Sequence, residues 1–282
     1  MRIVKLSRIL AHLLECVLSA SNKHEVFFHG AVPVKASRQT VKSGETAFLR
    51  NEKFEGLSPR WFEPDHWGAS LVPVGTGGRG GAWFLLCDGE DIVLRHYYRG
   101  GLVAHLSKRR YIFTGFERSR SFREFRILAQ LLKLNLPVPE PVGALAERVG
   151  TFRYQAAILV RRIPGAVAML EHDSIADDLI WRQVGETIAR FHAEGLDHVD
   201  LNCDNILVSA NDVYLIDFDR CKLRGVRSGS GMAGWQKRNL NRLKRSLEKR
   251  LDDLPEGGLA LRWQALLSGY EKGLSARKTV SD

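Results

Sequence analysis

The stretch HVDLNCDNILVSANDVYLIDFD, residues 198–219, contains the strongest structural signal in this sequence. Two short apolar runs, residues 206–208 and 213–216, are separated by a polar turn at Asn211 and Asp212. Apolar and β-branched runs on either side of such a turn predict two paired strands. We therefore expect a β-hairpin here, which brings the polar residues before its first strand close to those after its second strand.

The polar residues around this hairpin have the spacing of the catalytic and metal loops of protein kinases. His198 and Asp200 precede Asn205 in the pattern H-x-D-x-x-x-x-N, and Asp217 opens a D-F-x triplet in which Asp219 replaces glycine. The chemistry requires an acid near the acceptor hydroxyl, together with an amide and a second carboxylate that hold Mg²⁺ against the phosphates. One such residue alone is usually a cap or turn residue, but the joint pattern favours catalytic Asp200 and metal ligands Asn205 and Asp217.

A glycine-rich loop lies upstream, between two strand-like segments. It contains Gly75, Gly77, Gly78, Gly80 and Gly81 within seven residues. Glycine lets backbone N–H groups approach a phosphate closely, although a loop of this composition is more often an ordinary connection. Its place before a strand that ends in a basic residue favours the phosphate-binding interpretation.

That basic residue is Arg95, at the position where a protein kinase carries a phosphate-binding lysine. Arginine keeps the positive charge and adds bidentate geometry, although the two residues are not interchangeable. Glu124 is polar within the otherwise apolar helix pattern of residues 121–132. We expect Glu124 to orient Arg95; the alternative is an exposed helical glutamate.

The remaining pattern predicts an α+β chain with the two lobes of a protein-kinase-like fold. Residues 31–163 combine strand and turn signals with one helix, which indicates an antiparallel-sheet N-lobe that binds nucleotide. Residues 164–282 begin with a Pro-Gly hinge and indicate a small, mostly helical C-lobe. We expect its first helix to bury a stripe of Ile180, Val184, Ile188 and Phe191. Residues 1–30 carry an amphipathic helix pattern at Leu6, Ile9, Leu13 and Val17, with a signal peptide or an upstream start codon as alternatives.

Composition excludes several other classes of protein. The 282 residues are 44% hydrophobic and 26% charged, which is ordinary for a soluble globular chain and not for a disordered or coiled-coil one. No run of about 18 apolar residues indicates a membrane-spanning helix. The four cysteines lie far apart without a CxxC pair, which fits neither a disulfide framework nor a zinc site.

The positive charge is concentrated in one C-terminal segment. The whole chain has 42 basic and 32 acidic residues, and residues 220–250 hold 11 of the basic ones with a single acid, Glu248. A basic face suits phosphates, nucleic acid or an anionic membrane, and a solvated helical face is an equally good interpretation. One helical face there carries Leu240, Leu243, Leu247, Leu251 and Leu254. We expect these leucines to cover the C-lobe core rather than enter lipid.

Several stretches together resemble the 3-deoxy-D-manno-octulosonic acid (Kdo) kinases of the lipopolysaccharide-core kinase family. They are GRGGAWF (78–84), VLRHYYRGGLVAHL (93–106), RSRSFREFRILAQL (118–131), LPVPEPVGA (136–144), HVDLNCDNIL (198–207), YLIDFDRC (214–221) and NLNRLKRSL (239–247). The arginine at position 95 and the DFD triplet belong to the pattern of that family. The resemblance covers most of residues 60–250.

The resemblance implies ATP-dependent phosphorylation of the 4-hydroxyl of a Kdo residue on a lipid A precursor, with Mg²⁺ as cofactor. It also implies a peripheral location on the anionic cytoplasmic face of the bacterial inner membrane, and no nucleic acid partner is expected. Asp200 would be the base, Asn205 and Asp217 the metal ligands, and Arg95 the phosphate partner beneath the glycine loop.

Two other classes of function share some of these features. A heptose, aminoglycoside or protein kinase of the same fold would have all the motif residues. A basic nucleic-acid-binding or membrane-surface protein on a degenerate kinase fold is disfavoured, because Asp200, Asn205 and Asp217 are all present.

Overall fold

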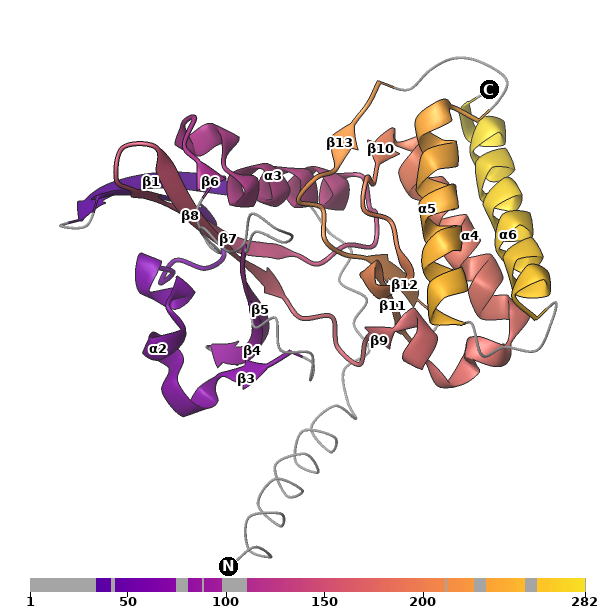
Figure 1. The fold of residues 1–282 in the computed structure, drawn as a ribbon, viewed down its shortest axis with the longest axis horizontal. Helices are drawn as coiled ribbons and strands as arrows, with labels where there is room; N and C mark the ends of the chain where they lie inside the picture. Colours follow the sequence, from indigo (N-terminus) through magenta and orange to yellow (C-terminus); the bar gives the residue numbers. More distant parts are fainter. Residues whose placement is uncertain are drawn as a thin grey trace, which may run out of the picture.

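The computed structural model describes residues 34–41, 44–74, 81–87, 89–97, 111–210, 212–225, 232–251 and 258–281. The described chain has a sheet-rich part and a helical part, which lie at opposite sides of Figure 1. Its helices are α2 (Pro64–Trp67), α3 (Arg120–Lys133), α4 (Asp178–Ala193), α5 (Gly234–Arg250) and α6 (Gly258–Ser281). The predicted amphipathic segment at residues 1–30 lies outside the described residues.

The first part of the chain is built on one antiparallel sheet of eight strands. These are β1 (Val34–Val41), β2 (Gly44–Asn51), β3 (Val72–Pro73), β4 (Ala82–Cys87), β5 (Glu90–His96), β6 (Tyr111–Ile112), β7 (Pro141–Val149) and β8 (Arg153–Arg161). The order is β1-β2-β7-β8-β5-β4-β3, and β6 also pairs with β8. Strands β1 and β2 place residues 34–51 at one end of this sheet.

Helix α3 packs on this sheet through the stripe that its sequence predicts. Phe122, Phe125 and Leu128 are all fully buried, and the Ser121 hydroxyl donates to the carbonyl of Leu145 in β7 at 2.8 Å. The chain leaves the helix at Asn135, whose φ of 53° is left-handed. The helix prediction is confirmed, and α3 is fixed against β7 by its apolar face.

The second part of the chain contains the predicted hairpin. Strand β11 (Ile206–Ser209) pairs antiparallel with β12 (Asp212–Leu215), so that Ile206 faces Leu215 in the register. Strand β9 (Val167–Ala168) extends this small sheet, and β10 (Leu196–Asp197) pairs separately with β13 (Lys222–Leu223). All strands of the large sheet precede Pro164 and helices α4 to α6 follow it, so we keep the proposed lobe boundary there.

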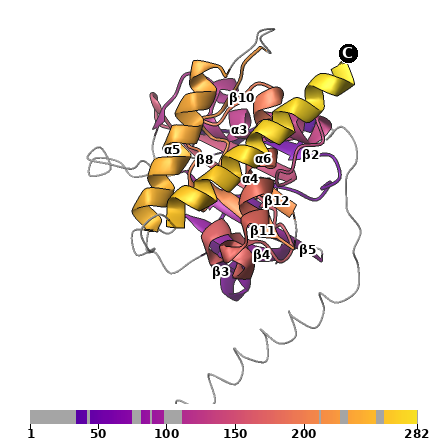
Figure 2. The same ribbon diagram turned by 90° about the vertical axis from the view of Figure 1, so that its right-hand side faces the viewer.

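Helices α4, α5 and α6 form the helical part, and Figure 2 shows α5 and α6 in front, on the side away from the large sheet. The predicted stripe of α4, from Ile180 to Phe191, is buried. On α5, Leu240, Leu243 and Leu247 are buried as expected. Leu251 is the C-cap residue of α5 and is partly buried against the same core, as expected, although the helix itself ends at Arg250. Leu254 lies outside the described residues.

Helix α6 has no counterpart in the sequence prediction. Its apolar residues do not form one stripe, since Leu261 is exposed while Leu266 and Tyr270 are buried. A helix without a clear periodic stripe gives little local signal. Among the described residues, no helix is both long and apolar enough to span a membrane.

Glycine at two positions allows α4 and α6 to approach closely. A Cβ atom added to Gly185 would lie 1.9 Å from the carbonyl oxygen of Leu266, and one added to Gly269 would lie 2.0 Å from that of Arg182. Backbone atoms cannot move aside as a flexible side chain can. These two glycines therefore set the distance between the helices.

We expect Gly185→Ala to lower the free energy of unfolding by about 1–3 kcal/mol or more, because the helices must separate to admit the methyl group. Urea unfolding at neutral pH measures this loss. Gly56→Ala is the matched control, since nothing lies within 4 Å of the added Cβ there. Equal stability of the two variants would contradict the close packing of α4 on α6.

Candidate active site

Three charged residues that are far apart in the sequence meet between the large sheet and the hairpin. Arg95, near the end of β5, donates from Nη1 to Asp217 Oδ1 at 2.7 Å and from Nη2 to Glu124 Oε1 at 2.6 Å. Strand β5 pairs with β8 on one side and β4 on the other, which fixes the backbone of Arg95. One guanidinium thus bridges a carboxylate of α3 and the carboxylate that follows β12.

Glu124 is held by donors on several sides. The Tyr97 hydroxyl donates to Glu124 Oε2, and the backbone N–H of Phe218 donates to Oε1 at 3.3 Å. The glutamate is only 3% exposed, so the alternative of an exposed helical glutamate is wrong. The guanidinium of Arg95 also lies 5.1 Å from the centre of the Tyr97 ring, a cation–π contact.

Burial and charge act against each other in this cluster. Burial alone would lower the pKa of Arg95, but the carboxylates of Glu124 and Asp217 raise it well above its ordinary value. Burial raises the pKa of Glu124, although Arg95 opposes this effect. Burial would likewise raise the pKa of Asp217, but Arg95 lowers it below the ordinary value. Asp217 is therefore an anion at neutral pH.

Asp217 and Asp219 differ in backbone conformation, exposure and ion pairing. Asp217 has a φ of 64°, in the left-handed region that side chains other than glycine rarely adopt, and its side chain is 33% exposed. Asp219 is buried, and Arg120 of α3 contacts both of its carboxylate oxygens, with Nε to Oδ1 at 2.6 Å. Because Arg120 already binds both carboxylate oxygens of Asp219, Asp217 is the better candidate metal ligand of the two.

The loop before β11 carries the remaining polar residues. The amide nitrogen of Asn205 donates to the carbonyl oxygen of Asp200 at 3.1 Å, and the side chain of Asn202 donates to the same oxygen at 3.0 Å. These bonds fix the loop and leave the amide oxygen of Asn205 as the end that can bind a cation. The Asp200 carboxylate is partly exposed and forms an ion pair with Arg242 of α5.

Within the described part of the chain, no group of three or more His, Cys, Asp or Glu side chains could hold a metal ion. Mg²⁺ does not require such a group, because it keeps several waters and uses one or two protein carboxylates together with substrate phosphates. The oxygen donors of Asp217 and Asn205 match that preference. Their chemistry is therefore compatible with a Mg²⁺–nucleotide complex.

His198 connects the loop to the strand before Asp217. Its Nε2 lies 3.0 Å from the carbonyl oxygen of Ile216, and its ring packs 5.2 Å from that of Phe218. Burial lowers the pKa of His198, so the ring is neutral and Nε2–H is the donor to Ile216. The histidine thus holds together the two segments that carry Asp200 and Asp217.

A buried polar network supports the start of this loop. Asn239 of α5 accepts from the backbone N–H of His198 at 3.0 Å and donates to Asp197 at 3.0 Å. His192 of α4 contacts Asn239 at 3.3 Å through Nε2 and the Tyr270 hydroxyl at 2.8 Å through Nδ1. The network links α4, α5 and α6 to the catalytic-loop pattern.

Burial lowers the pKa of His192 to about 4. In the unfolded chain His192 binds a proton with a pKa near 6.5, whereas in the folded protein its pKa is about 4. Protonation therefore favours the unfolded chain, and the free energy of unfolding falls as the pH decreases from about 6.5 to 4. Between pH 7 and pH 4.5 we expect this residue to account for a loss of about 2–3 kcal/mol.

Urea unfolding at both pH values measures this loss in the wild type and in His192→Gln, which cannot titrate. The variant should lose less stability than the wild type on acidification. The same loss in both proteins would mean that His192 is not the group responsible.

The structure thus brings together some of the predicted site residues and adds others. Arg95, Glu124 and Asp217 meet, and Asp200 and Asn205 share one loop. Gly75, Gly77, Gly78 and Gly80 lie outside the described residues. Three residues were missed: Tyr97 and Arg120, which hold Glu124 and Asp219, and Arg242, which contacts Asp200. Arg242 was visible as a member of the basic segment of residues 220–250, and Arg120 and Tyr97 as parts of the stretches that carry the family resemblance.

Residues 65–270 match the model of the family described as "Lipopolysaccharide kinase (Kdo/WaaP) family". A 3-deoxy-D-manno-octulosonic acid kinase of Stenotrophomonas maltophilia (strain K279a) is 47% identical over 190 residues, which cover 67% of this chain and 74% of the relative. One of Xanthomonas axonopodis pv. citri (strain 306) is 46% identical over 200 residues, covering 70% and 78%. A solved structure of WaaP in complex with acyl carrier protein aligns over 77% of this chain and 84% of that chain, with 15% identity and a TM-score of 0.46.

Proposed function

Because this chain belongs to the lipopolysaccharide kinase (Kdo/WaaP) family, we propose that it transfers the γ-phosphoryl group of ATP to the 4-hydroxyl of a Kdo residue. The acceptor is a lipid A precursor that bears Kdo, in the assembly of the lipopolysaccharide core. The observation that carries the proposal is the identity of 46–47% to Kdo kinases over 190 to 200 residues. The family match over residues 65–270 includes Arg95, Glu124, Asp200, Asn205 and Asp217.

Catalysis of phosphoryl transfer depends mainly on positioning and electrostatic stabilisation. Asp200 orients the acceptor hydroxyl and accepts its proton as the phosphate bond forms. Its loop is fixed by Asn202 and Asn205, which supports a well-defined direction of attack. The ion pair with Arg242 must loosen when Asp200 takes the proton, because protonation removes the negative charge.

Arg95 binds the phosphates of the nucleotide. Glu124 orients the guanidinium, and the hydroxyl of Tyr97 in turn fixes Glu124. We also assign Gly75, Gly77, Gly78 and Gly80 to phosphate binding, because glycine lets backbone N–H groups approach a phosphate closely. An arginine is suited to this task because its planar donors match phosphate oxygens in pairs.

Mg²⁺ would be held by Asp217 and Asn205, and when bound it supplies neutralisation of phosphate charge. The partly exposed and anionic carboxylate of Asp217 supports this assignment. In the protein without nucleotide, Arg95 supplies the positive charge beside Asp217 and Glu124.

Mass spectrometry tests the proposed reaction directly. The purified protein is incubated with ATP, Mg²⁺ and a lipid A precursor that bears Kdo, and we expect one added phosphate. Proton and phosphorus NMR of the product then locates the phosphate on O-4 of Kdo. Transfer to a heptose, an aminoglycoside or a protein instead of Kdo would replace this proposal with another kinase of the same fold.

We also propose that the protein acts peripherally at the cytoplasmic face of the inner membrane, because a lipid A precursor is embedded there. The basic helix α5 supports this proposal. Its leucines pack inward, whereas Lys237, Arg238, Arg242, Lys244 and Arg245 are exposed. Attraction of such a segment to anionic lipid is worth roughly 1 kcal/mol for each nearby cation and is screened by salt.

Co-sedimentation with anionic phospholipid vesicles tests the membrane contact. Neutralisation of these five cations should weaken binding at low salt, and high salt should weaken binding of the wild type in the same way. Neutral phosphatidylcholine vesicles are the control, on which the two proteins should not differ. Salt-insensitive binding, or equal binding of both proteins to the anionic vesicles, would show that α5 does not make the contact.

A further inference from the structure

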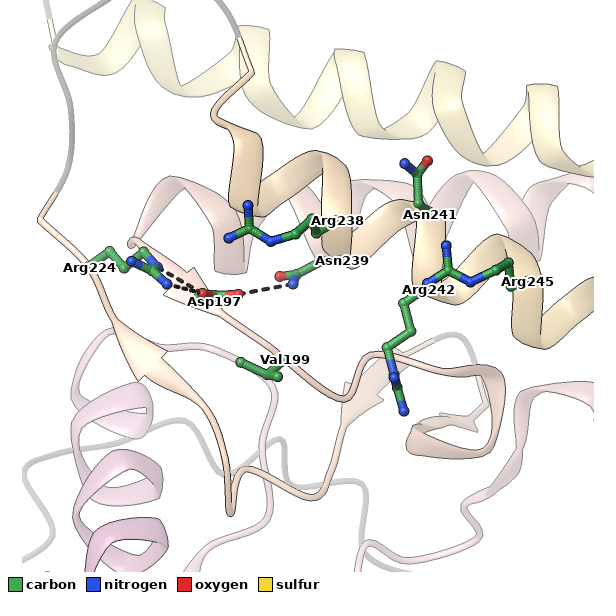
Figure 3. A pocket seen from close by; sticks show the side chains of 8 residues that line it. All are labelled: Asp197, Val199, Arg224, Arg238, Asn239, Asn241, Arg242 and Arg245. Carbon is green, nitrogen blue, oxygen red and sulfur yellow. Dashed lines mark hydrogen bonds and ion pairs between the residues drawn. The ribbon is translucent and has the colours of Figure 1, made fainter.

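An open pocket of about 360 Å³ lies beside the catalytic-loop pattern, between that loop and helix α5 (Figure 3). It is lined by Asp197, Val199, Arg224, Arg238, Asn239, Asn241, Arg242 and Arg245. Four of these eight residues are arginines, and only one is acidic. In Figure 3 the side chains of Arg238, Arg242 and Arg245 extend from one helix, with Arg224 opposite on the segment after β13.

The single carboxylate of the pocket, that of Asp197, already accepts hydrogen bonds from two neighbouring side chains. Asp197 accepts from Nε and Nη2 of Arg224 at 2.7 and 2.6 Å and from the amide of Asn239 at 3.0 Å. Arg242 reaches out of the pocket to the carboxylate of Asp200. Arg238 and Arg245 have no carboxylate partner within the part of the chain that the structure describes.

The placement of these arginines is unfavourable without an anion. Arg238, Arg242 and Arg245 are spaced by four and then three residues, so they lie on the same face of α5, where like charges destabilise a helix. Elsewhere on the helix, Lys244 is offset by Glu248 at the same spacing, 3.9 Å away. Arg238 and Arg245 therefore leave positive charge without a carboxylate partner, among the described residues, on the face of α5 that borders the catalytic loop.

Guanidinium groups in this arrangement recognise oxyanions. Their planar donors form paired, charge-assisted hydrogen bonds with phosphate or carboxylate oxygens. The pocket adjoins Asp200 through Arg242, so a molecule that is anchored here extends toward the proposed base. Val199, which is partly exposed, offers an apolar contact on the loop side.

We propose that this pocket binds an anionic group of the acceptor, a phosphate monoester or a sugar carboxylate, and thereby holds the hydroxyl at Asp200. The inference rests on the proposed function, since a lipid A precursor that bears Kdo carries both kinds of oxyanion. Arg238 and Arg245 are the specificity-determining residues, because neither is engaged by Asp197 or Asp200.

Steady-state kinetics of a double variant, Arg238→Gln with Arg245→Gln, tests the proposal. The acceptor is presented in neutral-detergent micelles, which removes attraction to an anionic surface. We expect the KM for the acceptor to rise at least about tenfold, since two charge-assisted contacts are lost, while the KM for ATP stays unchanged. The matched control, Arg153→Gln with Arg182→Gln, removes two exposed arginine charges that do not line the pocket and should behave as the wild type.

Two modified acceptors identify the anionic group. If the phosphates of lipid A occupy the pocket, removing them enzymatically abolishes the difference between the pocket variant and the wild type. If the Kdo carboxylate occupies the pocket, esterification of that carboxylate abolishes this difference, and removal of the phosphates does not. A pocket variant with the same acceptor KM as the control variant, or with a raised KM for ATP, would overturn the inference.

Calorimetric titration of the intact acceptor in the same micelles, without ATP, separates this inference from the proposed function. Binding by the wild type that the pocket variant loses supports the pocket even if no phosphate is transferred. Transfer by the wild type with equal acceptor binding by both proteins would support the function and reject the pocket.

Discussion

Replacing Asp200 with Asn lowers kcat by about 10²- to 10⁴-fold, the range for loss of a general base, and leaves nucleotide binding near that of the wild type. Asparagine has the same shape but cannot accept the proton of the acceptor hydroxyl. The two amides that fix this loop bond to the backbone carbonyl of Asp200 and not to its side chain. The substitution therefore removes the chemistry and preserves the loop.

The measurement is initial-rate kinetics with a saturating Kdo-bearing acceptor, together with titration of an ATP analogue. Asp204→Asn is the matched control on the same loop, since Asp204 is exposed and pairs with Arg250 at 3.3 Å. That variant should keep its activity. A folded Asp200→Asn protein with near-normal kcat would remove Asp200 from the mechanism.

We expect Asp217→Ala to abolish Mg²⁺-dependent nucleotide binding and to lower kcat/KM for ATP by at least about 10²- to 10³-fold. Asp217 is the partly exposed carboxylate that Arg95 holds at 2.7 Å, and its depressed pKa keeps it ionised. Asp219 cannot replace it, because both of its oxygens are engaged by Arg120. The proposed Mg²⁺ site then retains no carboxylate.

Fluorescence titration of a labelled ADP analogue, with and without Mg²⁺, measures this effect. In the wild type Mg²⁺ should strengthen binding, whereas in Asp217→Ala it should have no influence. Asp219→Ala provides the comparison. Because it leaves Arg120 without its buried partner, it should lower the free energy of unfolding but keep the Mg²⁺ effect in the folded protein. If Asp219→Ala lost the Mg²⁺ effect and Asp217→Ala kept it, the roles within the DFD triplet would be reversed.

These expectations depend on strain and packing around one turn. Asp217 adopts a left-handed backbone conformation, with Phe218 packed between Phe191 and His198. His198 in turn holds the carbonyl of Ile216. The surrounding core thus maintains a conformation that an isolated peptide would leave, which is common where a carboxylate must point in one direction.

Much of this protein is determined by its local sequence. The hairpin of β11 and β12 and the helices α3 and α4 were predicted because hydrophobic spacing reports directly on the face that each element buries. The catalytic spacing from His198 to Asp217 is also local, since one loop and one hairpin carry all of it. The inward packing of Leu240, Leu243 and Leu247 followed from the same periodicity.

Other features depend on contacts between distant segments. Arg95 and Asp217 are separated by 122 residues, and only the pairing of β5 in the sheet and the docking of α3 bring Glu124 between them. Helix α6 was not predicted, because its burial is set by the glycine contacts with α4 and not by a stripe of its own. The orientation of Arg242 toward Asp200 likewise depends on how α5 docks against the loop. Sequence periodicity determined which residues are buried. Tertiary packing decided which partner each charged group contacts. The reason is that a buried charge is stable only where another segment supplies a counter-charge.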